Sequence, residues 1–222
     1  MSEPQAAGPK PRLALLSPYG LGPDQAEATA AALDAACTAG DVAAVILRLA
    51  SADERSLVTL LKKLCPAAQE RGAAVVVAVP DFAGDLVSVA ARGGADGVHV
   101  ERADDETLRD LRGRLRDGRI LGAGGVLGSR DAAMLAGEAG ADYLLFGGLF
   151  PDGVAPEAGE VRERAVWWAE IFETPCIAVA AQADEVAALA ATGVEFVGLE
   201  SALWLGDAEG VRTAQAVLDQ AR

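Results

Sequence analysis

The chain has 222 residues, about half of them apolar, and a formal net charge of −14. Its length suits one domain with a sizeable core, and no uncharged apolar run is long enough to cross a bilayer. The acidic balance argues against nucleic acids and anionic membrane surfaces as partners, because phosphate groups are bound by clusters of Lys and Arg. Three cysteines without a CxxC pair predict neither a disulfide framework nor a zinc site.

Residues 1–11 are polar and contain several prolines. They lack the charged-then-apolar layout of a signal peptide. We therefore expect a loose leader over 1–11 and a single domain over 12–222, in a cytoplasmic protein.

Short apolar runs alternate with longer Ala-rich segments along the whole chain. The runs are apolar on both faces, which is typical of parallel strands that are covered on both sides. The predicted strands are Arg12–Ser17, Ala43–Leu49, Ala74–Val79, Gly97–Val100, Arg119–Gly122, Tyr143–Phe146, Cys176–Ala180 and Glu195–Leu199. Apolar residues at spacings of three and four predict helices between them, for example over Asp24–Ala39, Glu54–Arg71 and Ala183–Ala191.

A glycine recurs before every second strand, at a spacing of about fifty residues. These glycines are Gly40, Gly94, Gly140 and Gly193. Each follows a predicted helix, where a positive φ is expected. Four such units predict a (β/α)8 TIM barrel. A doubly wound open sheet is the alternative, but it calls for a GxGxxG turn after the first strand, and residues 17–22 read SPYGLG.

Reactive groups in such barrels lie where the strands end, on the loops that follow. In chain order these positions hold Arg48, Asp81, Asp104, Gly124, Gly147, Gly148 and Ser201. Because the carboxyl-terminal strand ends share one rim of a barrel, we expect these residues to surround one site.

Three segments resemble thiamine phosphate synthases. Residues 94–100 (GADGVHV), with Asp104 shortly after, are similar to that family's GADGVHLGQ-x-D segment. Residues 120–122 followed by 140–151 resemble its ILGxS…GADYxxxGPxFPT stretch, and residues 197–202 resemble its terminal VxVxSAI. The order and approximate spacing hold from about Arg12 to about Ala208.

This resemblance implies a reaction that joins hydroxymethylpyrimidine pyrophosphate to thiazole phosphate, giving thiamine phosphate and pyrophosphate. It implies Mg²⁺ held by Asp81 and Asp104, because both are hard oxygen ligands. The partners would be small phosphorylated molecules, and a homodimer is the default expectation for a small barrel. The candidate substrate-binding residues are Arg48, Gly124, Gly147, Gly148 and Ser201.

The sequence departs from the family pattern around the pyrophosphate. Donors or small residues of the family are replaced at Ile46, Ala50, Pro80, Gly124, 151–155 and the pair Ala180–Ala181, and an acid, Glu200, precedes Ser201. Losing one fixed donor to a leaving group typically costs about 3–4 kcal/mol. We therefore expect a degraded pyrophosphate site and inefficient catalysis by the family's usual arrangement.

Each candidate residue also has a purely structural interpretation. Asp81 and Asp104 are placed to cap helices, and the glycine pairs to form tight turns. His99, the only histidine, has no partner at triad spacing and is expected to be buried and hydrogen-bonded. Arg48 is equally suited to an ion pair with a carboxylate inside the barrel.

Three functions therefore stay open. The first is a divergent synthase that uses Asp81, Asp104 and Arg48. The second is a catalytically inactive, ligand-binding or regulatory paralogue. The third is a barrel enzyme with a less charged substrate, for which small residues at Ala50, Gly124 and Ala180–Ala181 leave room. Thiazole tautomerases share this barrel, but residues 124–126 offer no histidine for proton transfer.

Overall fold

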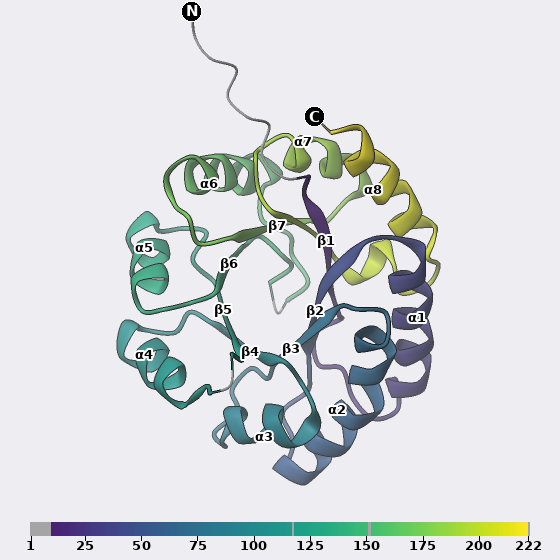
Figure 1. Ribbon diagram of the computed structural model, residues 1–222, viewed down its shortest axis with the longest axis vertical. Coiled ribbons are helices and arrows are strands. Elements are labelled where there is room, and N and C mark those ends of the chain that lie inside the picture. The colour runs from purple at the N-terminus through teal and green to yellow at the C-terminus, as the bar shows by residue number, and fades with distance from the viewer. Residues whose placement is uncertain (1–9, 117, 151, 222) are drawn as a thin grey trace, which may run out of the picture.

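Eight strands pair in parallel, each with the next in chain order, and the last pairs with the first to close a barrel. In Figure 1 the strands form a central ring and the helices surround it. The computed structural model describes residues 10–116, 118–150 and 152–221, so residues 1–9 of the predicted leader lie outside the described residues. The predicted (β/α)8 barrel is confirmed.

The strands are β1 (Arg12–Leu16), β2 (Val42–Arg48), β3 (Ala74–Ala78), β4 (Gly97–Glu101), β5 (Ile120–Gly124), β6 (Tyr143–Phe146), β7 (Cys176–Ala180) and β8 (Phe196–Leu199). The helices are α1 (Ala26–Ala39), α2 (Glu54–Gln69), α3 (Leu86–Gly93), α4 (Asp105–Arg114), α5 (Arg130–Glu138), α6 (Ala158–Ile171), α7 (Val186–Ala190) and α8 (Glu209–Gln220). Short 3₁₀ turns occur at Ala183–Glu185 and Ser201–Leu203. No helix in these described ranges is long and apolar enough to span a membrane.

The strand boundaries agree with the predicted ones to within two residues. The predicted helix Ala183–Ala191 is instead a 3₁₀ turn followed by the short helix α7. Of the four repeated glycines, three have the expected positive φ, namely Gly94, Gly140 and Gly193.

The prediction was wrong for Gly40, whose backbone is extended at φ −158°. A Cβ at this position would lie 2.9 Å from Val211 Cγ1 and 3.2 Å from Leu13 Cδ1. Gly40 is therefore needed because α8 and β1 approach it closely, and backbone conformation is not the reason.

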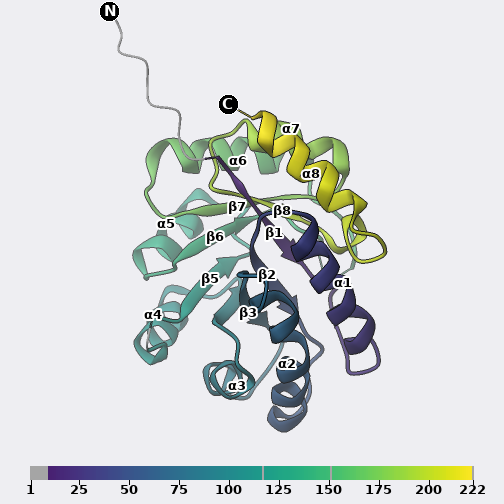
Figure 2. The same cartoon turned by 45° about the vertical axis from the view of Figure 1, so that its right-hand side comes forward.

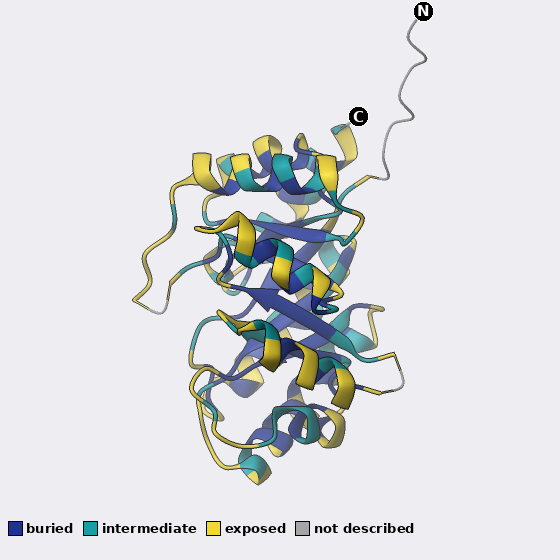
Figure 3. Ribbon diagram, turned by 90° about the vertical axis from the view of Figure 1, so that its left-hand side faces the viewer, coloured by how far each residue is buried: buried dark blue, intermediate teal, exposed yellow. Residues whose placement is uncertain are grey.

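The strands separate two apolar layers. Their outward-facing residues join the inner faces of the helices in one large cluster. A second cluster fills the barrel interior and consists of Ala14, Leu16, Ile46, Val76, Ala78, Tyr143, Leu145, Ile177 and Val179. In Figure 3 the strands are buried, whereas the helices alternate between buried and exposed residues. Because the interior is packed, a ligand has to bind at an end of the barrel.

The inward faces of β4, β5 and β6 position the polar groups of the interior. Alternate residues of a strand point to the same face, so His99 and Glu101 point inward while Val98 belongs to the outer cluster. His99 pairs with Gly122, and Gly122 pairs with Tyr143 on the next strand. Figure 2 shows β5 and β6 side by side within the barrel wall.

Two glycines provide a test of this packing. A Cβ at Gly97 would collide with the Ile120 carbonyl oxygen on the neighbouring strand, whereas a Cβ at Gly113, on α4, would meet nothing within 4 Å. We predict that Gly97→Ala lowers the free energy of unfolding by about 1–3 kcal/mol, as overpacking does. Gly113→Ala should raise it by about 0.5–1 kcal/mol through helix propensity. Denaturant unfolding measures both, and equal stability of the two variants would contradict the close approach of β4 and β5 at Gly97.

Candidate functional site

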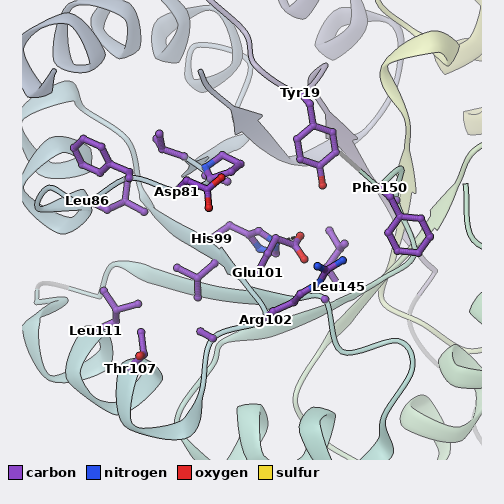
Figure 4. A pocket seen from close by; sticks show the side chains of 18 of the residues that line it. Tyr19, Asp81, Leu86, His99, Glu101, Arg102, Thr107, Leu111, Leu145 and Phe150 are labelled. Carbon is purple, nitrogen blue, oxygen red and sulfur yellow. Dashed lines mark hydrogen bonds and ion pairs between the residues drawn. The ribbon is translucent and has the colours of Figure 1, made fainter. Parts of the chain in front are cut away.

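A cavity of about 1190 Å³ opens where β3, β4 and β6 end. Its polar wall includes Asp81, His99, Glu101 and Arg102, and its backbone wall includes Gly147 and Gly148. Figure 4 shows Tyr19, Asp81, Glu101, Arg102 and Phe150 around this common space. The cavity thus lies at the rim where barrel enzymes bind their ligands.

A much smaller space of about 20 Å³ adjoins the cavity inside the barrel. Arg48, Tyr19, His99 and Glu101 line it, together with apolar residues. This volume is sufficient for about one water molecule. The polar groups around it are therefore close to one another but leave no room for a larger ligand.

Arg48 lies in this inner layer and forms a buried ion pair. Its two terminal nitrogens donate to Glu200 at 2.9 and 2.6 Å. Its Nε donates to the Ser17 carbonyl at 2.6 Å, and the Tyr19 ring lies 4.1 Å from its guanidinium carbon. The side chains of Arg48 and Glu200 are 4% and 1% exposed. The structure therefore confirms that Arg48 pairs with a carboxylate inside the barrel, and the side chain presents little surface to a ligand.

Other predicted substrate-binding residues also converge on Glu200. Gly147 and Gly148 both have positive φ and turn the chain so that the Leu149 amide donates to Glu200 Oε1 at 2.7 Å. The Ser201 amide donates to Glu200 Oε2 at 3.2 Å. Together with Arg48, these donors form an anion-binding arrangement. Its anion is a carboxylate of the chain itself.

The backbone amides of the loop after β7 also donate to a carboxylate of the chain. The Ala181 and Gln182 amides donate to Glu185 Oε2 at 2.7 and 3.3 Å. Here the family's glycine pair is replaced by Ala180–Ala181. Two groups of backbone donors at this rim are therefore already occupied by Glu200 and Glu185.

A series of hydrogen-bonded side chains runs across the barrel interior to the cavity. The Tyr143 hydroxyl lies 2.9 Å from His99 Nδ1, and His99 Nε2 lies 3.0 Å from Glu101 Oε1. Burial, followed by the charge of Glu101, raises the pKa of Tyr143 well above its ordinary value, so this hydroxyl stays protonated. With a neutral imidazole and an ionised Glu101, the Tyr143 hydroxyl donates to Nδ1 and Nε2–H donates to the carboxylate.

Glycines on β5 leave the space that these hydrogen-bonded side chains occupy. A Cβ at Gly122 would collide with the Tyr143 ring, and a Cβ at Gly124 would lie 2.8 Å from Glu101 Oε2. The predicted ligand-binding residue Gly124 thus lies beside a carboxylate of the chain. Its lack of a side chain gives Glu101 its space at the cavity wall.

The two predicted metal ligands differ in their surroundings. Asp81 lines the cavity and has a positive φ of 55°, an uncommon conformation that is often found at functional sites. Asp104 caps α4, and its Oδ1 accepts from the Thr107 amide at 2.8 Å. Hydrogen bonds from the Thr107 side chain and backbone hold the pKa of Asp104 below its usual value. Thr107 itself lines the cavity.

These residues fit Mg²⁺ only as a small donor set. The described residues contain no group of three or more His, Cys, Asp or Glu that could hold a metal ion. Protein-bound Mg²⁺ often keeps several waters and uses one or two carboxylates plus phosphate oxygens of the substrate. Asp81 faces the cavity and could supply one such carboxylate, whereas Asp104 is not among the residues that line the cavity and its carboxylate caps α4.

Both signs of charge are present on the cavity wall. Within the described residues, the carboxylates are those of Asp81, Glu101, Asp110 and Glu160, and the guanidinium groups are those of Arg102 and Arg114. Arg114 contacts Asp85 and lies 3.5 Å from Asp110. Arg102 has a φ of 54° and forms no ion pair with any other residue that the structure describes. It is therefore the cavity's available cation.

Sequence reasoning missed Glu101, Arg102 and Tyr143. Glu101 and Tyr143 could have been found from the pattern H-x-E on β4 followed by G-x-G on β5. Alternate residues of a strand share a face, and glycines leave space for the side chains on the neighbouring strands. The expectation for His99 was confirmed, since it is 2% exposed and hydrogen-bonded. The carboxylate partner expected for Arg48 is Glu200.

The buried pair should be sensitive to loss of one partner. We predict that Glu200→Gln lowers the free energy of unfolding by about 3–5 kcal/mol, because Arg48 is left buried without a compensating charge. The double variant Arg48→Met/Glu200→Leu should be more stable than Glu200→Gln. Denaturant unfolding measures both.

An exposed ion pair supplies the control for that experiment. Arg130 and Glu163 lie 3.3 Å apart with side chains 50% and 75% exposed. Glu163→Gln should change stability by less than about 1 kcal/mol. The account of the buried pair is wrong if the two glutamine variants unfold alike.

Comparisons with known proteins identify the family of the chain. Residues 19–203 match the family model described as thiamine monophosphate synthase. The chain is 36% identical to the thiamine-phosphate synthase of Rhodospirillum centenum, over 87% of this chain and 89% of that protein. It is 31% identical to the thiamine-phosphate synthase of Hyphomonas neptunium, over 99% of each.

A solved structure gives the same fold. The thiamine phosphate pyrophosphorylase from Pyrococcus furiosus aligns with a TM-score of 0.71 at 22% identity, over 96% of this chain and 97% of that one. At this identity the likeness supports the barrel alone. The extent of the family match and the identity to full-length relatives carry the assignment, and the chain belongs to the thiamine monophosphate synthase family.

Proposed function

We propose that the protein joins hydroxymethylpyrimidine pyrophosphate to thiazole phosphate, at a rate limited by its altered phosphate contacts. One observation carries this proposal: the family-like segments 94–104 and 140–150 both contribute to the wall of one large cavity at the barrel rim. Segment 197–202 lies beside it, with Glu200 bonded to the Leu149 amide. Segments that are far apart in sequence thus meet where a small ligand would bind.

In this proposal Asp81 and Asp104 would hold Mg²⁺, which would supply positive charge to a leaving pyrophosphate. Arg102 provides a cation for a phosphate group, because it lines the cavity and has no carboxylate partner among the described residues. The bond between the pyrimidine methylene carbon and the pyrophosphate oxygen breaks, and its electrons leave with pyrophosphate. The thiazole nitrogen then forms the new C–N bond with its lone pair.

Glu200 and Glu185 limit the rate in this account. They occupy the amides of Leu149, Ser201 and Ala181. A phosphate at either position would have to displace a carboxylate or meet its charge. Since fixed donors usually supply much of the stabilisation of a leaving group, catalysis with these donors occupied is expected to be slow.

A catalytically inactive ligand-binding paralogue is the second candidate. The same occupied donors favour it, because they are satisfied without any ligand. It would bind phosphorylated ligands of the family at the cavity without turnover. A cytoplasmic location and a homodimer stay predictions under either candidate.

The two candidates differ in a direct assay. We predict that the purified protein with Mg²⁺ and both substrates forms thiamine phosphate above an enzyme-free blank, and that chelation of the metal abolishes it. Asp81→Asn should lower kcat/KM at least tenfold, because it removes a ligand charge while asparagine tolerates the positive φ. Arg102→Ala should raise the KM of a phosphorylated substrate several-fold.

Arg109→Ala is the matched control, since Arg109 lies on α4 and pairs with Asp105. It should leave the kinetics unchanged. No product above the blank would reject the synthase proposal. Calorimetric binding of thiamine phosphate in that case would favour the paralogue, and absence of binding would reject both.

A further inference from the structure

Glu101 occupies an unusual position for this family. The segment that resembles GADGVHLGQ reads GADGVHVER here, so Glu101 stands at a glycine of the motif and Arg102 at its glutamine. Glu101 ends β4, and its side chain lines the cavity. In Figure 4 its carboxylate faces the same space as the Tyr19 hydroxyl and the Arg102 side chain. This sequence therefore places a charged side chain on the cavity wall.

The carboxylate is held from behind by a fixed support. His99 Nε2 lies 3.0 Å from Glu101 Oε1, and Tyr143 holds the other ring nitrogen at 2.9 Å. The rings of His99 and Tyr143 are stacked, with centroids 5.6 Å apart. His99 and Tyr143 are 2% and 7% exposed, whereas the Glu101 side chain is 35% exposed. The buried pair thus orients a carboxylate whose other end remains accessible from the cavity.

A glycine on β5 leaves space for the Glu101 carboxylate. Gly124 lies directly beside it, and any side chain there would overlap with both carboxylate oxygens. Within the described residues, Glu101 Oε2 has no hydrogen-bond or ion-pair partner. Arg102 is the neighbouring cation, but it forms no ion pair with Glu101 among the described contacts. The negative charge is therefore available to a ligand.

The proposed reaction generates a complementary charge. Loss of pyrophosphate leaves a pyrimidine cation, and bond formation at the thiazole nitrogen leaves that ring permanently cationic. A fixed, preorganised charge stabilises a charge that develops beside it without further reorganisation. The adjacent residues Glu101 and Arg102 also present opposite charges to one cavity, which matches a ligand with a cationic ring and a phosphate arm.

We infer that Glu101, supported by His99 and Tyr143, is a recognition site for an aromatic ring cation, the thiazolium ring of the product. The inference rests on the proposed function for the identity of the ring. It assigns Glu101 a direct contact with the ligand, and His99 and Tyr143 positioning roles. The site requires no phosphate on the ligand, so it can be tested with thiamine itself.

Calorimetry of the full chain gives the test. The ligands are thiamine and a deaza analogue in which carbon replaces the charged ring nitrogen. Wild-type protein should bind thiamine about tenfold more tightly than the neutral analogue, as expected for one partly desolvated charge contact. Glu101→Gln keeps the shape of the side chain and should bring this ratio close to one. The matched control Glu106→Gln, an equal charge change on exposed α4 surface, should preserve it.

His99 supplies two further measurements. As the chain's only histidine, it gives one pair of imidazole nitrogen signals in labelled protein, and thiamine should shift them. His99→Gln, which keeps an N–H donor, should retain more of the tenfold preference than His99→Leu. Four results would each overturn the inference. Wild-type protein could fail to bind thiamine, or could bind both ligands equally. The preference for thiamine could survive Glu101→Gln, or thiamine could bind without moving the His99 signals.

Failure of the proposed function gives a different result. A protein that binds thiamine through Glu101 but forms no thiamine phosphate keeps the recognition site and loses the synthase activity. A protein that forms thiamine phosphate while Glu101→Gln leaves thiamine binding unchanged keeps the activity and loses this inference.

Discussion

The buried ion pair between Arg48 and Glu200 determines much of the rim chemistry. Arg48 ends β2, contacts the Ser17 carbonyl after β1, and reaches Glu200 after β8. These three strands are neighbours at the seam where the barrel closes. A buried arginine needs a charge partner, and here the partner also satisfies the Leu149 and Ser201 amides. One carboxylate therefore pairs with Arg48 at the barrel seam and accepts from both of these amides.

The cavity beside this pair has a different character. His99 and Glu101 line the cavity, Tyr143 supports His99 from behind, and Arg102 and Asp81 also belong to the cavity wall. Glycines at 122 and 124 are as important as the polar residues, because they leave the space that these side chains fill. The family barrel is thus retained. In the proposed function Arg102 would contact a phosphate in place of the backbone amides, and Glu101 would face the ring cation.

The fold could be predicted from the sequence, but the contacts between side chains within the site could not. Alternating apolar runs and family-like segments predict the barrel and the rim positions, because both depend on local pattern. The positive φ of Gly94 follows from a helix end, whereas the extended Gly40 depends on α8, which is distant in sequence. The same holds for Arg48: its expected place inside the barrel of an acidic chain allowed a carboxylate partner, but the 152-residue separation from Glu200 concealed which one. Glu101 was missed because the space for its carboxylate at the cavity depends on a glycine of the next strand.

A crystal structure with bound thiamine phosphate would test the central claim most directly, namely that Glu200, and not a ligand phosphate, occupies the donors of Arg48, Leu149 and Ser201. We predict that Glu200 keeps its contacts with Arg48, Leu149 and Ser201, that the phosphate lies at Arg102, and that the ring cation lies at Glu101. A phosphate bound to the Leu149 and Ser201 amides, with Glu200 turned away from Arg48, would contradict the account.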